Sequence, residues 1–360
     1  MASRYYRPEL DALRFFAFAS VFCDHVPIDS HWYQPIQDAG AFGMCMFFLL
    51  SAYLIITILL REKETIGTVD LGAFFARRAL RIWPLYFLVL FAGYFFGLHY
   101  RGSATVSKHA LLAFSFLLGN VYVLFYNWLG PINALWSLSV EEQFYIAVPA
   151  IVRMGGRRGV IVIGVAAITI SYLVLLHLGL HHAVSRLVWA NSFVQFQFFA
   201  AGGLLALWLY HRAVVLSLQV RMAMAAAGII LWFVGGSLFH VKEFLPLAPA
   251  PLLAGFFAVL IGTSMIFLSV INMNLRIPQP FIYLGKISYG LYLFHGFFLW
   301  GLFETSDRWP CMTYFPRHKL VSVPLALGLT IATAAFSYHF FERPILQFKQ
   351  RFETIKTRPA

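Results

Sequence analysis

Apolar residues fall into about eleven segments long enough to cross a bilayer as α-helices, and this pattern constrains the fold more than any other feature. Hydrophobic residues make up 60% of the 360 residues and charged residues 12%, whereas a soluble domain has about a quarter of charged residues. We therefore expect an all-α, polytopic membrane helix bundle, with residues 1–360 as a single integral-membrane domain and no appended soluble domain. The segments are 9–27, 40–60, 83–99, 109–126, 134–152, 160–178, 193–210, 222–240, 252–271, 286–304 and 320–340.

Loop charges predict the orientation, because cytoplasmic loops of membrane proteins are enriched in Lys and Arg. The N-terminal segment, the loops 61–82 and 153–158, and the C-terminal tail are basic, whereas the loop 28–39 contains no Lys or Arg. This predicts that both termini are cytoplasmic and that the protein lies in the plasma (cell inner) membrane. The same rule accounts for the net charge of +12, so we expect no nucleic-acid partner.

One apolar segment cannot be a simple span. Three segments separate the two internal basic loops, and an odd number of crossings would not return the chain to the same side. We favour 134–152 as the exception because it contains Glu141, Glu142 and Gln143, and polar structure at membrane depth is tolerated where it lines a cavity. The expectation is about ten transmembrane helices plus one re-entrant or broken segment.

The first apolar segment carries two ionisable residues, Arg14 and His25. A charge at the bilayer centre costs roughly 2.5 to 3.5 kcal/mol, so such residues usually have a function. Eleven helical residues make three turns plus about 20°, which places both side chains on one face about 16 Å apart along the axis. Asp11 lies one turn before Arg14 and could pair with it, either within a functional site or only to fix helix packing. Asp24 precedes His25, but adjacent helical residues diverge by about 100°, so no dyad is expected.

Four other polar sets interrupt apolar sequence. Arg78 and Arg81 are three residues apart and share a helix face at the entrance of a predicted span, where they either bind phosphate or only set topology. Glu141 and Glu142 line a pore or form a structural ion pair. Tyr292 and His295 recur with Ser288 at helical spacing, on a functional face or in interhelical hydrogen bonds. Ser51 lies mid-helix, where it can bond to its own helix carbonyl. The three cysteines show no metal-ligand spacing, so no metal is expected.

Six strings, taken in order, resemble the acyltransferase 3 family of integral-membrane acyltransferases. In the string RPELDALRFFAFASVFCDHV the family shows an Arg, ten residues and then a His. In the string MFFLLSAYLI, Ala52 stands where the family has Gly. The strings are RPELDALRFFAFASVFCDHV, MFFLLSAYLI, RRALRIWPLY, WSLSVEEQFY, ISYGLYLFH and FERP.

The resemblance implies transfer of an acyl group, usually acetyl, from cytoplasmic acyl-coenzyme A to a hydroxyl of a carbohydrate-containing acceptor. Such acceptors are surface polysaccharides, lipopolysaccharide, peptidoglycan or glycosylated metabolites. On this hypothesis Arg78, Arg81 and Arg14 bind the donor, His25 is the catalytic base, and Glu141 orients His25 or stabilises its imidazolium. Direct transfer and an acyl-enzyme on Ser51 or His25 both remain open.

Two alternatives compete with this hypothesis. The chain could be a secondary transporter with His25, Glu141 and Glu142 as a proton relay, although such transporters often show internal repeats and none is evident here. It could also belong to the membrane-bound O-acyltransferases, but an arginine ahead of the histidine is not their pattern.

Overall fold

The computed structural model describes residues 6–99, 106–126, 130–239, 247–273, 276–303 and 318–355, and the regular structure in these ranges is helical. By length and composition, five described segments are long and apolar enough to cross a membrane, so the chain is an integral membrane protein. These segments are Gln34–Ile66, Gly130–Leu180, Leu218–Leu238, Pro249–Val270 and Lys319–Phe352. The all-α expectation is confirmed.

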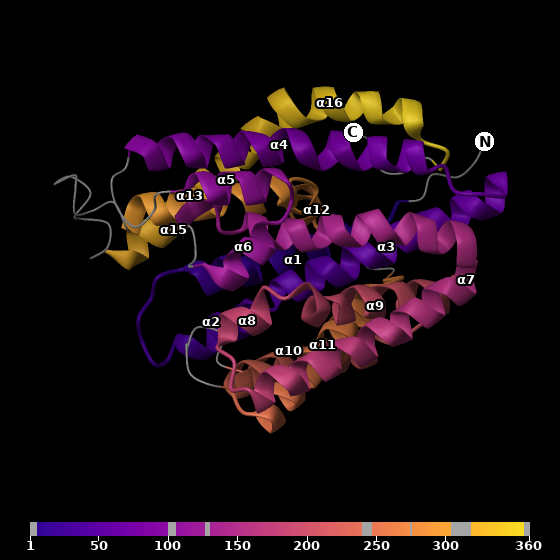
Figure 1. Ribbon diagram of the computed structural model, residues 1–360, viewed down its shortest axis with the longest axis horizontal. Helices are drawn as coiled ribbons and strands as arrows, with labels where there is room; N and C mark the ends of the chain where they lie inside the picture. The colour runs from indigo at the N-terminus through magenta and orange to yellow at the C-terminus, as the bar shows by residue number, and fades with distance from the viewer. Residues whose placement is uncertain are drawn as a thin grey trace.

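The helices run roughly along one common direction (Figure 1). The bend in α7 and the end of the described C-terminal segment lie toward the same end of the bundle (Figure 1). In order, the helices are α1 Pro8–His25, α2 Gln34–Gly40, α3 Gly43–Ile66, α4 Leu71–His99, α5 Lys108–Ser115, α6 Gly119–Phe125, η1 Gly130–Ile132, α7 Leu135–Leu180, α8 Ser185–Trp189, α9 Ser192–Trp208, α10 Leu218–Phe239, α11 Pro249–Val270, α12 Gln279–Lys286, α13 Ser288–Phe303, α15 Lys319–Ser337, η3 Tyr338–Glu342, α16 Arg343–Phe348 and η4 Lys349–Phe352.

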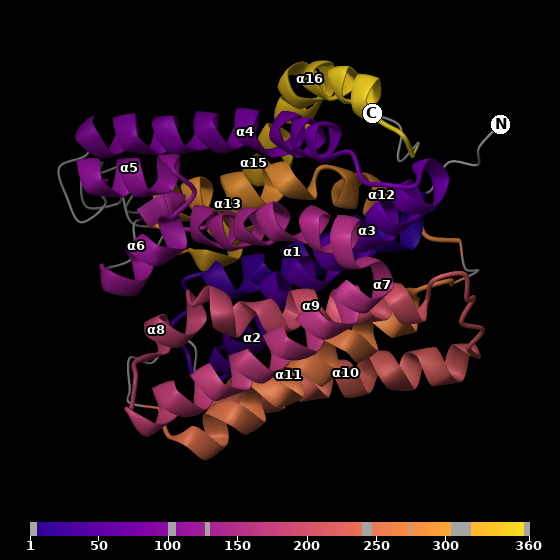
Figure 2. The same ribbon diagram turned by 45° about the vertical axis from the view of Figure 1, so that its right-hand side comes forward.

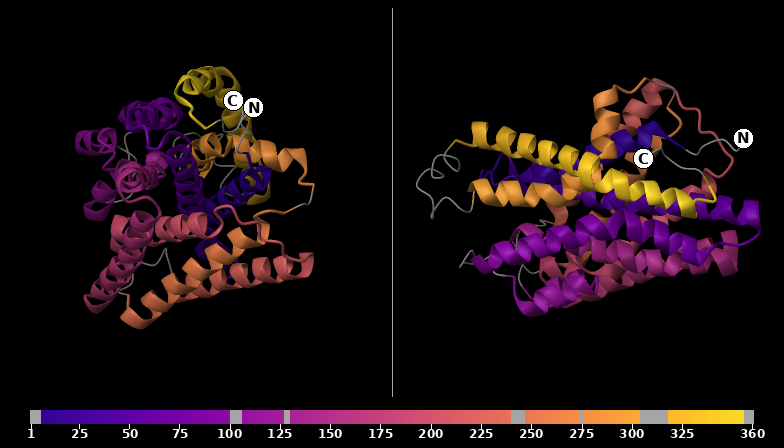
Figure 3. Two further views of the ribbon diagram at one scale, coloured as in Figure 1. Left: turned by 90° about the vertical axis from the view of Figure 1, so that its right-hand side faces the viewer. Right: turned by 90° about the horizontal axis from the view of Figure 1, so that it is seen from above.

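Helix α1 lies inside the bundle, in contact with α2, α3, α11, α12 and α13, as the end-on view shows (Figure 3). Its start follows from the sequence: Pro8 occupies the first turn, where its missing N–H costs nothing, and Glu9 and Asp11 face the positive end of the helix dipole. Helices α10 and α11 pack along each other at one side of the bundle (Figure 2). Because α1 is central, polar side chains at its two ends can contact different sets of neighbouring helices.

Helices α3 and α9 approach closely through Gly202. A Cβ at this position would lie 2.2 Å from the Leu49 carbonyl oxygen and 3.0 Å from the Ala52 Cβ, so only glycine fits. The glycine that permits this close approach is therefore on α9, facing Ala52 of α3.

The broken segment is 108–125 and not 134–152, so the sequence-based choice between them was wrong. Helix α5 ends in a Schellman-type turn, in which Leu117 has a φ of 58° and the Leu118 N–H donates to the Ala113 carbonyl at 2.8 Å. Helices α5 and α6 have 8 and 7 residues. At 1.5 Å per residue, each is about 12 Å long or less, well short of the roughly 30 Å hydrocarbon core.

Residues 135–152 are instead continuous helix, and the polar Gln143 side chain within them is hydrogen-bonded through both of its amide atoms. The Gln143 amide donates to the Asn120 side chain at 2.9 Å and accepts from the Ser192 hydroxyl at 2.6 Å. Helix α7 then bends at Gly156, whose φ of 54° and ψ of −138° suit glycine alone. The bend divides α7 into two membrane-length halves at the predicted basic loop.

Candidate active site

A cavity of about 410 Å³ opens between α1, α3, α4, α7, α13 and the C-terminal segment. Its lining includes Tyr6 and Arg7, just before α1, and Ile355, just after η4, so it lies where α1 begins and the described C-terminal segment ends. At its inner part it reaches Ser137 and Tyr292.

The lining of the cavity is basic. It includes six cationic side chains and four carboxylates, an excess of two positive charges. An excess of fixed cations in a concave site favours a polyanionic ligand such as a phosphate group. The cations are Arg7, Arg14, Arg77, Arg78, Arg81 and Lys349, and the carboxylates are Asp11, Glu62, Glu141 and Glu353.

Two adjacent arginines have different surroundings. The Arg77 guanidinium is buried, donates to Glu62 Oε2 at 2.9 Å and reaches the Phe352 carbonyl at 2.5 Å, so it ties α4 to α3 and to the C-terminal segment. Arg78 lies over the Phe74 and Tyr145 rings at 5.8 and 5.7 Å. Arg78 and Arg81 both line the cavity, which confirms that they share a face of α4.

Arg14 lies deeper along α1, and its predicted pairing with Asp11 is confirmed. The Arg14 Nη1 atom donates to Asp11 Oδ1 at 2.8 Å, and the Asp11 side chain is only 2% exposed. Because a buried carboxylate fixes the guanidinium, Arg14 presents its remaining surface to the cavity in a defined orientation.

Glu141 lies in this cavity and not beside His25. Its Oε1 atom accepts hydrogen bonds from the Ser51 hydroxyl and the Tyr145 hydroxyl. The Ser51 hydroxyl on α3 therefore contacts a carboxylate of α7, which favours the functional reading of Ser51 over a bond to its own helix carbonyl. Glu142, one residue on, is buried against α4 near Trp83 and is not part of the cavity lining.

Helix α13 connects the cavity to a second polar group. Ser288 and Tyr292 line the cavity, and the Tyr292 hydroxyl lies 2.7 Å from the Ser137 hydroxyl and donates to the Ala134 carbonyl at 3.2 Å. One turn further along α13, His295 is fully buried, and its Nδ1 atom donates to the Tyr292 carbonyl at 2.6 Å. The polar face predicted for this helix therefore runs from the cavity to His295.

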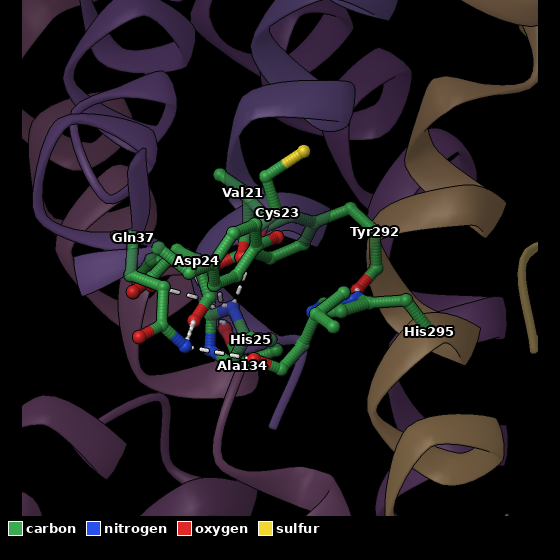
Figure 4. A network of polar contacts seen from close by, with 11 residues as sticks. Val21, Cys23, Asp24, His25, Gln37, Ala134, Tyr292 and His295 are labelled. Carbon is green, nitrogen blue, oxygen red and sulfur yellow. Dashed lines mark hydrogen bonds and ion pairs between the residues drawn. The ribbon is translucent and has the colours of Figure 1, made fainter. Parts of the chain in front are cut away.

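His25 ends α1 and lies beside His295, with 5.0 Å between the ring centroids. Figure 4 shows it between the last turn of α1, Gln37 of α2 and His295 of α13. Its Nδ1 atom lies 2.9 Å from the Val21 carbonyl oxygen, which can only accept, so Nδ1 carries the hydrogen in the neutral ring. The Nε2 lone pair is then the basic position of His25.

Asp24 and His25 were expected to diverge, and this expectation was wrong. Asp24 Oδ2 lies 3.4 Å from His25 Nδ1. The reason is that the helix ends here. Val26 adopts an extended backbone conformation, and the His25 ring folds back over the last turn of α1. A carboxylate on the Nδ1 side stabilises an imidazolium and keeps the ring orientation.

Several residues of the cavity were not among the predicted site residues, and Tyr145, Ser137 and Lys349 are examples. Tyr145 and Ser137 lie at helical spacing from Glu141 and were part of a string already noted, so their position on α7 was available. Lys349 was counted only as a basic residue of the tail, and no local signal in the sequence marks its return to the cavity.

Comparisons with known proteins identify the family to which the sequence is similar. Residues 7–342 match the family model described as an acyltransferase domain. The peptidoglycan O-acetyltransferase OatA of Listeria monocytogenes is 27% identical over 95% of this chain and 56% of its own length. The O-acetyltransferase OatA of Staphylococcus aureus is 25% identical over 96% of this chain and 58% of its own length. The chain thus spans less than three fifths of the length of these curated relatives, and no solved structure matches it significantly.

Proposed function

The chain belongs to the acyltransferase 3 family, and from this premise we propose that it moves an acetyl group from cytoplasmic acyl-coenzyme A to a hydroxyl of a cell-envelope carbohydrate. Family membership makes it an acyltransferase and removes the reason for a transporter. The observation that carries the proposal is the basic cavity at the terminal end of the bundle, joined along α1 and α13 to His25.

The topology forms part of this proposal. Ten crossings follow if α1, α3, α4, both halves of α7, α9, α10, α11, α13 and α15 each span and α5 with α6 forms the broken segment. Two crossings, α4 and the first half of α7, then separate the basic loops 61–82 and 153–158, as the charge rule requires. Both termini and the mouth of the cavity are cytoplasmic in this arrangement, where acyl-coenzyme A is made available.

The charge and length of the site suit this donor. Arg78 and Arg81 at the mouth bind its phosphates, and Arg14 holds the start of the neutral arm. The rise from Arg14 to His25 is about 16 Å along α1, which places the thioester near His25.

The reaction then needs a base at the far end of the arm. His25 Nε2 takes the proton of the acceptor hydroxyl as its oxygen attacks the thioester carbonyl. The C–S bond breaks, the acyl group stays on the acceptor oxygen, and the proton passes from His25 to the leaving thiolate. Asp24 supports the imidazolium that forms in between. Glu141 has a different role in this scheme, because it holds the Ser51 and Tyr145 hydroxyls inside the cavity.

One contact favours a second route. The Ser51 hydroxyl donates to the Glu141 carboxylate, an arrangement that can activate a serine nucleophile, so an acyl-Ser51 intermediate is the alternative to direct transfer. Mass analysis of the protein after donor is added without acceptor separates the routes, because only the second leaves an acyl group on Ser51.

The experiment that tests the proposed function uses purified protein in vesicles. Labelled acetyl-coenzyme A is supplied on one side, and soluble glycan fragments are supplied on the other. We expect label in the glycan and a matching acetyl mass change in envelope glycans of cells that carry the gene. Donor consumption with no label in any carbohydrate would contradict the acceptor class.

A further inference from the structure

The C-terminal segment is part of the cavity and not an appendage to it. Helix α16 and η4 pack along α4, as the view from above shows (Figure 3). The buried Arg77 guanidinium holds this segment through the Phe352 carbonyl while it pairs with Glu62 on α3. The segment is therefore fixed to the same helix that carries the donor-binding arginines.

This fixed segment brings both a cation and an anion into the cavity. Lys349 and Glu353 line it together with Arg78 and Arg81. The Lys349 Nζ atom lies 3.0 Å from Glu353 Oε1, and the two side chains are 13% and 11% exposed. A largely buried ammonium group needs an anion close by, because desolvation without a partner is costly. Glu353 supplies that anion in the structure.

We propose that the C-terminal turn completes the donor site: Lys349 binds the phosphates of the donor together with Arg78 and Arg81, and the Glu353 carboxylate occupies this place until the donor displaces it. The inference rests on the proposed function, because it assumes a phosphate-bearing donor in this cavity. Lysine pairs with both phosphate and carboxylate groups in proteins, so one can replace the other at Lys349.

Opposite effects of two neighbouring substitutions follow from this competition. Lys349→Gln removes a cation that the donor needs, so binding weakens. Glu353→Gln removes the competing carboxylate, so binding tightens. Arg351 provides a matched control, because it lies in the same turn and carries the same charge, but it is exposed, lies over the Phe348 ring and does not line the cavity.

The test is calorimetric titration of the full chain in nanodiscs with coenzyme A, and separately with pantetheine, which has the arm but no phosphates. For coenzyme A we expect the Kd to rise about tenfold or more in Lys349→Gln, the size of one charge-assisted contact. We expect it to fall several-fold in Glu353→Gln and to stay unchanged in Arg351→Gln. For pantetheine none of the three should change the affinity.

Two results would overturn the inference: a normal coenzyme A affinity in Lys349→Gln, or an unchanged or weaker affinity in Glu353→Gln. The second variant keeps the test decisive even if Lys349→Gln fails to fold. Arg78→Gln separates this inference from the proposed function. If Arg78→Gln weakens coenzyme A binding and Lys349→Gln does not, only the role of the C-terminal turn fails. If neither weakens it, the donor site itself lies elsewhere.

Discussion

Arg77 and Arg78 are neighbours in the sequence, yet we expect their replacement to affect different properties. Replacing Arg77 should lower the stability of the protein, and replacing Arg78 should weaken donor binding. Arg77→Gln leaves the fully buried Glu62 carboxylate without its cation and removes the bond to the Phe352 carbonyl. Breaking a buried pair from one side costs about 3 to 5 kcal/mol. At about 2 °C per kcal/mol for a chain of this size, the melting temperature should fall by roughly 6 to 10 °C.

Arg78→Gln should leave the stability of the protein nearly unchanged and weaken the binding of the donor. The Arg78 guanidinium lies over the Phe74 and Tyr145 rings, and each such contact is worth about 0.5 to 1 kcal/mol. The loss of stability should therefore be small. Loss of a phosphate contact should raise the KM for acetyl-coenzyme A about tenfold, with kcat at saturating donor nearly unchanged, because remote contacts supply uniform binding.

A thermal-shift assay in detergent and steady-state kinetics on both variants measure these quantities. The reasoning would be refuted if Arg78→Gln lowered the melting temperature as far as Arg77→Gln while its KM stayed at the wild-type value. Charge and spacing in the sequence do not distinguish Arg77 from Arg78. The result therefore tests the different roles that the structure gives these two arginines.

Three further predictions use other parts of the molecule. Gly156→Ala should lose about 1 to 3 kcal/mol of stability in a denaturation assay because of its positive φ, whereas Gly155→Ala, next to it in open helix, should lose none. His295→Phe keeps an aromatic ring beside the base but removes the nitrogens; kcat should fall at least tenfold with the donor KM unchanged, and a wild-type kcat would make His295 a packing residue. Single cysteines in 61–82 and in the C-terminal tail should label only from the cytoplasmic side, and outside labelling of the tail would reject the ten-crossing topology.

The parts of the fold that could be predicted are those set within one helix. Long apolar segments identified most of the helices, because bilayer thickness fixes their length. The Asp11–Arg14 pair and the shared face of Arg78 and Arg81 also follow from helical spacing alone.

The parts that could not be predicted depend on distant segments or on local dihedral angles. Glu141 finds Ser51 across 90 residues of sequence, and Lys349 returns to the cavity from the C-terminal tail. The break in 108–125 uses Leu117 in a left-handed conformation, where glycine would have been the usual signal. Because two glutamates seemed the stronger reason for a break, the sequence pointed to the wrong segment.

The predicted site divides into two groups in the structure. Arg14, Ser51 and Glu141 gather in the cavity, while His25, Asp24 and His295 gather at the opposite end of α1. Their separation along one helix was predictable from the Arg14 to His25 spacing. The membership of Glu141 in the donor-side group was not, because sequence alone does not give the rotation of α7 relative to α1.

The measurement that tests the account most directly is acyl transfer by purified His25→Ala protein, made alongside a coenzyme A titration of the same sample. We predict that transfer falls by roughly 10² to 10⁴-fold, the usual size of a general-base contribution, while the Kd for coenzyme A stays at the wild-type value. His25→Gln should not restore transfer, because an amide does not accept the proton. A near wild-type rate in His25→Ala would contradict the central claim that His25 is the base at the far end of the donor arm.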